Sequence, residues 1–555
     1  MIAPTQSPEK PRPGVNIRPG RGVPFVTICC TKGTSMTSTS AIQPSYDHGP
    51  GDRPLLGETI GENFDRIATV HADREAMVDR PTGRRWTYAE LHRDVLALAH
   101  GLLGLGIGKG DRVGIWAPNR PEWTLLQYAT AEIGAILVPI NPAYRTDELA
   151  YVVRQAGIRL LVAAPSFRTS DYAAMIEDAR PECPGLRWVV LLGSADWHAL
   201  PDPAGDPCAL AARQALLSPD DPINIQYTSG TTGHPKGATL SHHNILNNAH
   251  LTGEIVGYTE FDRICVPVPL YHTFGMVIGN LGATTHGACL VYPAQAFDPA
   301  ATLAAVAEER CTSLYGVPAM FIAELAEPGF GAYDLSSLRT GIIGGAPCPV
   351  EVMRQLVDRM GLTGVTIAYG MTETSPVSAQ TRPDDTLDRR VSTVGRVHPH
   401  VEIKIVDPET GVTVPRGVPG ELCTRGYSVM LGYWQQPGKT AEAVDAARWM
   451  QTGDLATMDA DGYVNITGRL KDMVTRGGRT SRRARSRNSC TPTRTSGTSR
   501  SSGYQTRDSA KRSWRGSGCI PAPGRSPRPT SGTTPAASSP TTRSPATCAS
   551  WRTSR

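Results

Sequence analysis

The stretch YTSGTTGHPKG, residues 227–237, decides how the rest of the chain is interpreted. An apolar run at 223–226 precedes it and predicts a buried strand, and residues 241–244 after it predict the start of a helix. Glycines let a backbone approach a ligand closely, freed N–H groups and hydroxyls donate to phosphate oxygens, and Lys236 adds a positive charge. The stretch therefore predicts a polyphosphate-binding loop. Taken alone, it also fits a flexible surface loop, and Ala238 stands where a P-loop has Ser or Thr.

The order of residues in this loop resembles the phosphate loop of the adenylate-forming superfamily, which includes acyl-CoA synthetases, luciferases and peptide-synthetase adenylation domains. The resemblance implies that ATP is the ligand. It assigns the polyphosphate to Thr228, Ser229, Gly230, Thr231, Thr232, Gly233 and Lys236.

Two further motifs resemble parts of the substrate pocket of this family. In PLYHTFG, residues 269–275, the resemblance places His272 beside the carboxylate pocket, although a lone histidine is more often structural. In Gly344-Gly345-Ala346-Pro347 it implies contact with adenine and the acyl pocket. An ordinary strand-to-helix turn would explain these glycines equally well.

The motif YGMTE, residues 369–373, is more specific. The resemblance implies that Tyr369, with Gly370 and Met371, packs on adenine, that Thr372 donates to the α-phosphate, and that Glu373 binds Mg²⁺. A hard cation prefers carboxylate and phosphate oxygens, so the chemistry is coherent. The alternative is a strand end with a surface glutamate.

Two motifs near the end of the ordered region complete the set. TGD, residues 452–454, resembles the family motif whose aspartate accepts both ribose hydroxyls, which implies that role for Asp454. GRLKD, residues 468–472, implies that Arg469 reaches ribose or phosphate and that Lys471 is the hinge between domains. Taken alone, Arg469 and Lys471 would be a solvated hairpin end.

The length of 555 residues and the 40% hydrophobic content predict a large core and at least two domains. Apolar runs alternate with helical stretches over residues 56–398, which predicts an α/β body of largely parallel sheets with helices on both faces. Hairpin patterns over 399–470 predict a small β subdomain, followed by a hinge at 471–478. Residues 1–55 are rich in Pro, Gly, Ser and Thr and predict disorder, with Met36 as a possible true start and a targeting sequence as the alternative.

Residues 479–555 have a different composition. They contain no Leu, Val, Phe, Met or Glu, and sixteen basic residues against one acidic residue give a formal charge of +15, which leaves −10 on residues 1–478. Such a segment predicts disorder. Back-translation with a displacement of one base yields stretches resembling the family's C-terminal α+β domain, beginning E-N-I-P-P-R-E-I-E, so a frameshift explains the break. The alternative is a basic arm for nucleic acid or a membrane surface.

The segments 223–248 and 425–434 look most like medium- and long-chain acyl-CoA synthetases. The resemblance implies an ATP-dependent ligase that forms a fatty acyl-adenylate and then acyl-CoA, using Mg²⁺ and coenzyme A, with activity impaired by loss of the C-terminal domain. The alternatives are an acyl-AMP ligase that feeds a carrier protein and a nucleotide-binding pseudoenzyme. Twelve cysteines without paired metal spacing indicate a reduced compartment, and the chain has no apolar run long enough to span a membrane, so we expect a cytoplasmic protein with no specific nucleic-acid partner.

Overall fold

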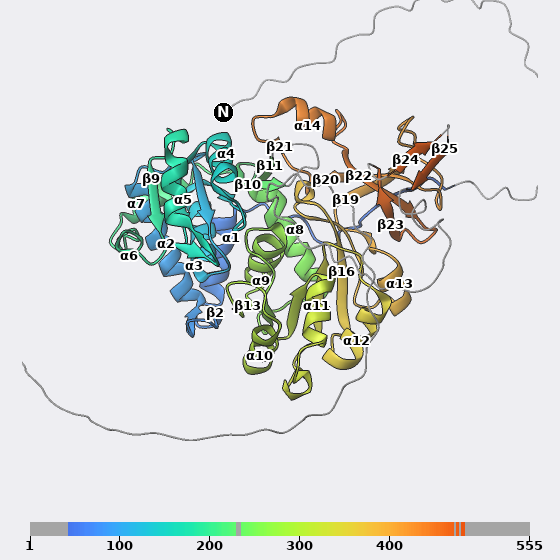
Figure 1. Ribbon diagram of the computed structural model, residues 1–555, viewed down its shortest axis with the longest axis horizontal. Helices are drawn as coiled ribbons and strands as arrows, with labels where there is room; N and C mark the ends of the chain where they lie inside the picture. Colours follow the sequence, from blue (N-terminus) through green and yellow to red (C-terminus); the bar gives the residue numbers. More distant parts are fainter. Residues whose placement is uncertain (1–42, 229–234, 471–472, 477–478, 483–555) are drawn as a thin grey trace, which may run out of the picture. The chain divides into compact units, whose positions relative to one another are not determined.

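The computed structural model describes residues 43–228, 235–470, 473–476 and 479–482, and all of them belong to one compact unit. Figure 1 shows two large sheets with helices packed around them and a smaller all-β part. The predicted α/β body with a β subdomain is confirmed.

The first sheet has seven strands, with five parallel strands and an antiparallel edge. Its order is β21 (Gly432–Tyr433), β11 (Lys236–Ser241), β10 (Pro222–Thr228), β5 (Ile136–Pro139), β4 (Arg112–Trp116), β6 (Ile158–Ala163) and β9 (Trp188–Leu191). The accompanying helices are α1 (Ile60–Val70), α2 (Tyr88–Gly104), α3 (Pro121–Ile133), α4 (Thr146–Ala156), α5 (Tyr172–Ala179), α6 (Ala195–Ala199) and α7 (Pro207–Gln214), with a short 3-10 turn η1 (Arg180–Glu182) and a small ribbon of β7 (Ser166–Phe167) and β8 (Ser170–Asp171).

The second sheet has nine strands with a parallel centre. Its order is β18 (Arg396–Val397), β17 (Val377–Gln380), β16 (Gly364–Gly370), β15 (Thr340–Gly344), β14 (Ser313–Gly316), β12 (Arg263–Cys265), β13 (Cys289–Tyr292), β2 (Glu75–Asp79) and β3 (Arg84–Thr87). The helices of this part are α8 (His242–Val256), η2 (Phe274–Leu281), α9 (Gly282–Thr284), α10 (Pro299–Glu309), α11 (Pro318–Leu325), η3 (Phe330–Ala332), α12 (Val350–Met360), η4 (Thr372–Thr374) and α13 (Leu387–Ser392).

The β subdomain is a five-stranded antiparallel sheet. Its order is β1 (Tyr46–His48), β19 (Val401–Val406), β20 (Gly420–Gly426), β22 (Met450–Met458) and β23 (Val464–Arg469), and α14 (Pro437–Ala443) lies between β21 and β22 in the sequence. Alternate residues of β19, Val401, Ile403 and Ile405, are fully buried in a core of their own. This is the hydrophobic pattern from which the strand was predicted.

Helix α8 contacts both large sheets, at β11 and at β16. Ser241 caps its N-terminus through a capping box with Asn244, as the sequence indicated. Asn248, in the middle of the helix, donates to the backbone oxygen of Val377 and accepts from its N–H, both at 2.9 Å. The helix thereby fixes the segment after the YGMTE motif relative to the hairpin of β10 and β11.

The prediction of disorder through residue 55 is wrong for residues 43–55. β1 pairs with β19 in antiparallel register, Tyr46 opposite Lys404, and the Tyr46 hydroxyl donates to Glu402 at 2.8 Å. A three-residue strand whose partner lies about 350 residues away leaves no local pattern to detect. Residues 1–42 lie outside the described residues.

The prediction of disorder from residue 479 onward is also wrong for its first four residues. β24 (Met473–Arg476) pairs with β25 (Arg479–Arg482), and the residues between them in the sequence are Gly-Gly. A two-residue Gly-Gly connection favours a tight hairpin. The rest of that prediction, residues 483–555, falls outside the described residues.

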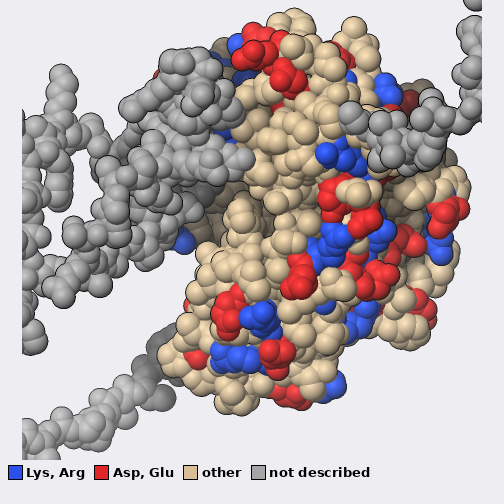
Figure 2. Space-filling model, turned by 90° about the vertical axis from the view of Figure 1, so that its right-hand side faces the viewer, with Lys and Arg blue, Asp and Glu red and all other residues tan. Residues whose placement is uncertain are grey.

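The surface turned to the viewer in Figure 2 carries acidic and basic side chains interspersed with one another. Ion pairs between such side chains occur in the described part of the chain, for example those of Arg389 with Asp459 and Asp461. Over the described part of the chain, helices that combine the length and apolar character required for a membrane span do not occur.

Candidate active site

The hairpin of β10 and β11 forms the base of the predicted phosphate loop. Its last register pair is Thr228 opposite Lys236, so these two residues stand at the two ends of the loop. Ser229, Gly230, Thr231, Thr232 and Gly233 lie outside the described residues. Lys236 is half-buried, and its Nζ lies 4.7 Å from the centroid of the Tyr433 ring, within the range of a cation–π contact.

Tyr433 connects Lys236 to Glu373. Its hydroxyl donates to Glu373 Oε1 at 2.8 Å, and Met430 N donates to the backbone oxygen of Glu373 at 2.9 Å. Glu373 is only 5% exposed. Burial, together with the negative charge of Glu373, raises the pKa of Tyr433, so the phenol remains a donor over the whole physiological range. Lys236 of the phosphate loop thus contacts the ring of Tyr433, and Glu373 of the YGMTE motif contacts the hydroxyl of the same residue.

The Gly344–Pro347 turn and the YGMTE motif lie side by side because the strands that precede them are neighbours. β15 and β16 are parallel, with Gly344 opposite Ala368, so both chains leave the sheet at the same edge. Ligands of α/β sheets bind outside the carboxyl ends of such strands. Gly345 has φ +79°, which favours glycine, and the three residues from Gly345 to Pro347 are exposed, whereas Thr372 is buried.

The PLYHTFG segment joins the same region through two contacts. Gln226 of β10 donates from Nε2 to the Tyr271 backbone oxygen at 2.6 Å. The Phe274 ring lies against Gly344, where a Cβ would stand 3.6 Å from it, and stacks with Tyr315 at 5.6 Å. His272, between them, is therefore held near the end of β15.

His272 itself is exposed, and Phe274 N donates to its Nδ1 at 3.3 Å. That contact favours the tautomer with the proton on Nε2. Although the ring is open to water, the protein packed around it lowers the pKa of the imidazole by desolvation. The neutral form therefore predominates at pH 7, and it can donate one hydrogen bond from Nε2.

Tyr369, Asp454 and Arg469 form a second group. Tyr369 Oη donates to Asp454 Oδ2 at 2.8 Å, and Arg469 Nε lies 3.0 Å from Asp454 Oδ1. Asp454 and Arg469 are cross-strand partners on β22 and β23, which places two residues from different motifs opposite one another. Asp454 is buried and Arg469 is exposed, and burial raises the pKa of Tyr369 well above its ordinary value, with Asp454 adding to the effect. Lys471, the predicted hinge, lies outside the described residues.

The structure therefore brings the described members of all six motifs together by a chain of contacts. Tyr433 and Gln226 are the two connecting residues that sequence reasoning assigned no role. Tyr433 lies in a segment that resembles the family, but its place beside Glu373 arises from pairing of parts of the chain that are 60 residues apart. Gln226 also lies in a segment that resembles the family, 223–248, but a polar residue in a strand is common and indicates no particular role.

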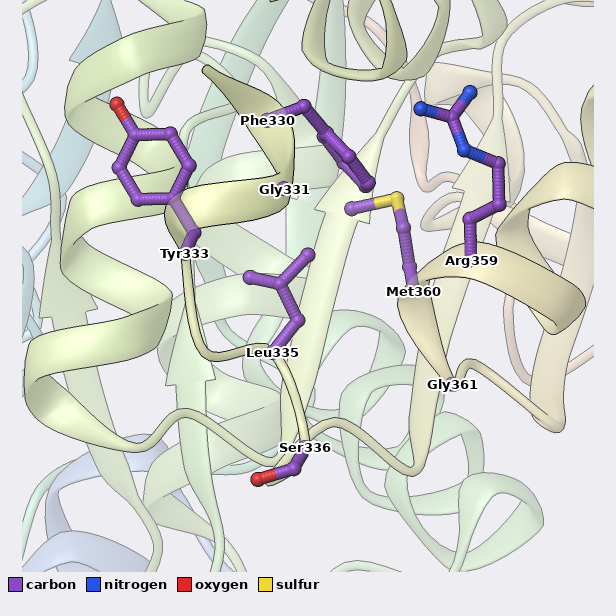
Figure 3. Close-up of a pocket in the computed structure, with 8 residues that line it drawn as sticks. All are labelled: Phe330, Gly331, Tyr333, Leu335, Ser336, Arg359, Met360 and Gly361. Atoms are coloured by element: carbon purple, nitrogen blue, oxygen red, sulfur yellow. The ribbon is translucent and has the colours of Figure 1, made fainter.

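A cavity of about 250 Å³ lies elsewhere, between η3 and the end of α12 (Figure 3). In it the Arg359 guanidinium stands 4.6 Å from the centroid of the Phe330 ring. None of its eight lining residues belongs to a predicted motif. The cavity is therefore separate from the contacts that join the motifs.

Glu373 is the described residue whose chemistry fits a magnesium ion in this region. Tyr433 occupies one oxygen of its carboxylate and so fixes the orientation of the other, and Mg²⁺ takes oxygen ligands, commonly one or two carboxylates with substrate phosphates. The buried position also strengthens any electrostatic interaction with a cation.

Comparison with known proteins agrees with this arrangement. The family model described as "AMP-binding enzyme" matches residues 64–434. The chain is 42% identical over 480 residues to the mitochondrial medium-chain acyl-CoA ligase ACSF2 of Danio rerio, covering 82% of this chain and 79% of that protein. It is 43% identical over 447 residues to the acyl-CoA ligase SID4 of Ajellomyces capsulatus, covering 78% and 76%.

Among solved structures, the anthranilate CoA ligase AuaEII in complex with anthranoyl-AMP superposes with a TM-score of 0.69 at 28% identity, covering 77% of this chain and 81% of that one. The family match spans well over half of the chain; four of the six motifs lie inside it, and TGD and GRLKD lie after its end. The chain belongs to the family of AMP-binding enzymes.

Proposed function

We propose that this protein is an ATP-dependent acyl-CoA synthetase that activates a medium- or long-chain fatty acid. In the first step a carboxylate oxygen of the acid attacks the α-phosphorus of ATP, and pyrophosphate leaves. In the second step the thiol of coenzyme A loses its proton and attacks the carbonyl carbon of the acyl-adenylate, and AMP leaves. The observation that carries the proposal is the link from Lys236 through Tyr433 to Glu373.

The residues have separate roles in this proposal. Thr228 and Lys236 hold the polyphosphate together with the loop between them, and Thr372 donates to the α-phosphate. Glu373 holds Mg²⁺, which when bound neutralises phosphate charge so that a carboxylate can approach. Positioning and charge neutralisation, rather than covalent chemistry by the protein, supply the rate enhancement.

Nucleotide recognition is assigned to the second group of residues and to the glycine-rich turn. Tyr369, with Gly370 and Met371, packs on adenine, and residues 344–347 lie against adenine and the acyl pocket. Asp454 accepts from the ribose hydroxyls, and Arg469, already paired with it, holds the ribose or a phosphate. His272 borders the acyl carboxylate. Its neutral imidazole can donate a hydrogen bond from Nε2 to that carboxylate without adding a positive charge to the pocket.

The substrate class rests on the relatives. Proteins named medium-chain acyl-CoA ligases are 40–42% identical to this chain over 459–494 residues. The segments that resemble fatty-acid-activating members point the same way. A cytoplasmic location stays a prediction.

The composition of residues 479–555 supports a further part of the proposal, that the chain as written turns over slowly. In the family, the C-terminal domain supplies a lysine for adenylation and the surface for coenzyme A, and Lys511, the one lysine after Lys471, stands in no matching motif. Losing one transition-state contact costs about 3–4 kcal/mol, or 10²–10³ in rate. A nucleotide-binding protein with weak turnover is therefore the expected behaviour.

The test separates these possibilities. Fatty-acid-dependent exchange of radioactive pyrophosphate into ATP reports the first step alone, and thioester formation with free coenzyme A reports the second. A version restored to the other reading frame after Gly478 should perform both, and the 555-residue chain should bind Mg-ATP but exchange pyrophosphate weakly. Acyl-adenylate formation without any thioester in the restored version would favour an acyl-AMP ligase that feeds a carrier protein. Failure of both chains to bind Mg-ATP would refute the proposal.

A further inference from the structure

A group of metal-ligating side chains lies apart from the candidate active site, at the C-terminal half of α8. His250 and Glu254 are four residues apart on this helix and so share one face, and His286 follows α9. One ligand atom from each of the three residues lies within 4.8 Å of the other two. Contacts between α8 and α9 bring the two segments together.

His286 is oriented as a metal ligand by its own neighbours. Its Nδ1 lies 2.9 Å from the backbone oxygen of Gly282 and 3.0 Å from Thr285 Oγ1, an arrangement that places the proton on Nδ1 and leaves a lone pair on Nε2. Metal-binding histidines commonly donate their second ring N–H in this way. The side chain is only 5% exposed, and Nε2 makes no hydrogen bond among the described residues while lying 3.5 Å from Glu254 Oε1.

The helix is shaped to admit this ring. A Cβ at Gly253 would stand 2.4 Å from His286 Cε1, so a larger residue at that position would displace the imidazole. The close approach of His286 to α8 therefore depends on glycine one residue before Glu254.

His250 completes the group from the same helix face. Its ring stacks on His286 with centroids 5.0 Å apart, and its Nδ1 is buried without a hydrogen-bond partner in the described part of the chain. Within the described part of the chain, His250 Nδ1 thus lacks the partner that a buried polar atom normally has, and the nearest acceptor to His286 Nε2 is Glu254 Oε1, at 3.5 Å.

We propose that His250, Glu254 and His286 bind one divalent transition-metal ion such as Zn²⁺ or Co²⁺. Two imidazoles and a carboxylate are a donor set for such ions, whereas Mg²⁺ prefers oxygen ligands alone. Metal–ligand distances of about 2.0–2.2 Å require side-chain rotations that bring the three atoms together and turn the two stacked rings so that their lone pairs converge. The bound ion would tie α8 to the segment after α9. This site is independent of the proposed function and of Glu373.

Arg53 supplies a test of opposite sign. Its Nη1 lies 3.1 Å from Glu254 Oε2, and its side chain is 70% exposed. This guanidinium neutralises the carboxylate that a metal would use, so it competes with the ion. Removing it should tighten metal binding, whereas removing a ligand should weaken it.

The experiment is a titration of the purified, metal-stripped 555-residue chain with Co²⁺ in the presence of millimolar Mg²⁺. Visible d–d bands report nitrogen and oxygen ligation, and sulfur-to-metal charge-transfer bands would reveal binding to thiols instead. Equilibrium dialysis with metal analysis gives the stoichiometry, and thermal unfolding gives the stabilisation. The variants are His250→Asn, His286→Asn and Arg53→Ala, with His198→Asn, an exposed histidine on α6, as the matched control.

We expect the native chain and the His198→Asn control to bind one equivalent with d–d bands and a higher midpoint of thermal unfolding. Losing an outer-shell partner costs about 10–100-fold in affinity, so each ligand substitution should weaken binding at least that much. Arg53→Ala should bind more tightly than the native chain. Absence of d–d bands from the native chain, or equal affinities in the native, His286→Asn and His198→Asn proteins, would overturn the proposal. Should the histidine variants fail to fold, the native titration and the direction of the Arg53→Ala change decide the matter.

Discussion

Replacing Tyr433 by phenylalanine tests the link between the phosphate-loop lysine and the proposed magnesium ligand. The change deletes one hydroxyl, which donates to Glu373 Oε1 at 2.8 Å, and it retains the ring beneath Lys236. Hydrogen bonds to charged groups contribute about 1.5–3 kcal/mol. If that energy orients the carboxylate for Mg²⁺, the Mg²⁺-dependent affinity for ATP should fall by about 10–150-fold.

The assay is calorimetric titration of the chain with ATP at several Mg²⁺ concentrations. Tyr463→Phe is the matched control, because the Tyr463 hydroxyl also donates to a carboxylate, that of Asp385, away from the motifs. Tyr433→Leu, which removes the ring as well, should bind ATP more weakly than Tyr433→Phe. A cation–π contact contributes about 0.5 kcal/mol at an exposed position and about 2 kcal/mol at a buried one. If Tyr433→Phe and Tyr463→Phe have the same Mg²⁺ dependence, the positioning role assigned to Tyr433 is refuted.

Three further predictions concern the nucleotide and the core. Asp454→Asn should reduce the preference for ATP over 2′,3′-dideoxy-ATP to nearly one, measured by competition binding, and an unchanged preference would show that the ribose lies elsewhere. Lys236→Met should weaken ATP binding much more than AMP binding, while Lys439→Met, on the exposed helix α14 and paired with Glu442, should weaken neither. Burial raises the pKa of Glu132 to about 8, so this carboxyl is protonated in the folded protein at pH 7. Because the folded pKa lies above the unfolded pKa, the contribution of Glu132 to the free energy of unfolding is fully present below the unfolded pKa and is lost as pH rises through 8. The native protein should therefore lose a few kcal/mol in its free energy of unfolding between pH 6 and pH 9, because each pKa unit corresponds to about 1.4 kcal/mol. The Glu132→Gln protein should not show this loss. Denaturant titrations that give the same loss in both proteins would contradict the assignment.

Features with a local cause were predictable from the sequence. The helix α3 begins at Pro121 in its first turn and ends before Gly134, which has φ +70°, because proline and glycine have fixed conformational preferences at those positions. The strands β4, β5, β6 and β13 are apolar runs of the kind from which the α/β body was predicted. The family resemblance rested on motif order, which sequence preserves.

Features that depend on distant pairing were not predictable. The strand β1 exists because β19 offers an edge, and the hydrogen bond from Tyr433 to Glu373 joins residues 60 positions apart. The motif TGD predicted that Asp454 binds ribose, but not that Tyr369 and Arg469 both contact it in the fold. Likewise, His250 and Glu254 are four residues apart on one helix, which is common on any helix face. The approach of His286 from another segment makes them a candidate metal site, and the sequence did not show it.

The central claim is that Lys236, Glu373 and Asp454 surround one magnesium nucleotide. A crystal structure of the chain with a non-hydrolysable ATP analogue and Mn²⁺, with anomalous data, tests it most directly. We expect a manganese peak bonded to Glu373, phosphate oxygens beside Lys236 and ribose hydroxyls at Asp454. Nucleotide density away from these three residues, or manganese that avoids Glu373, would contradict it.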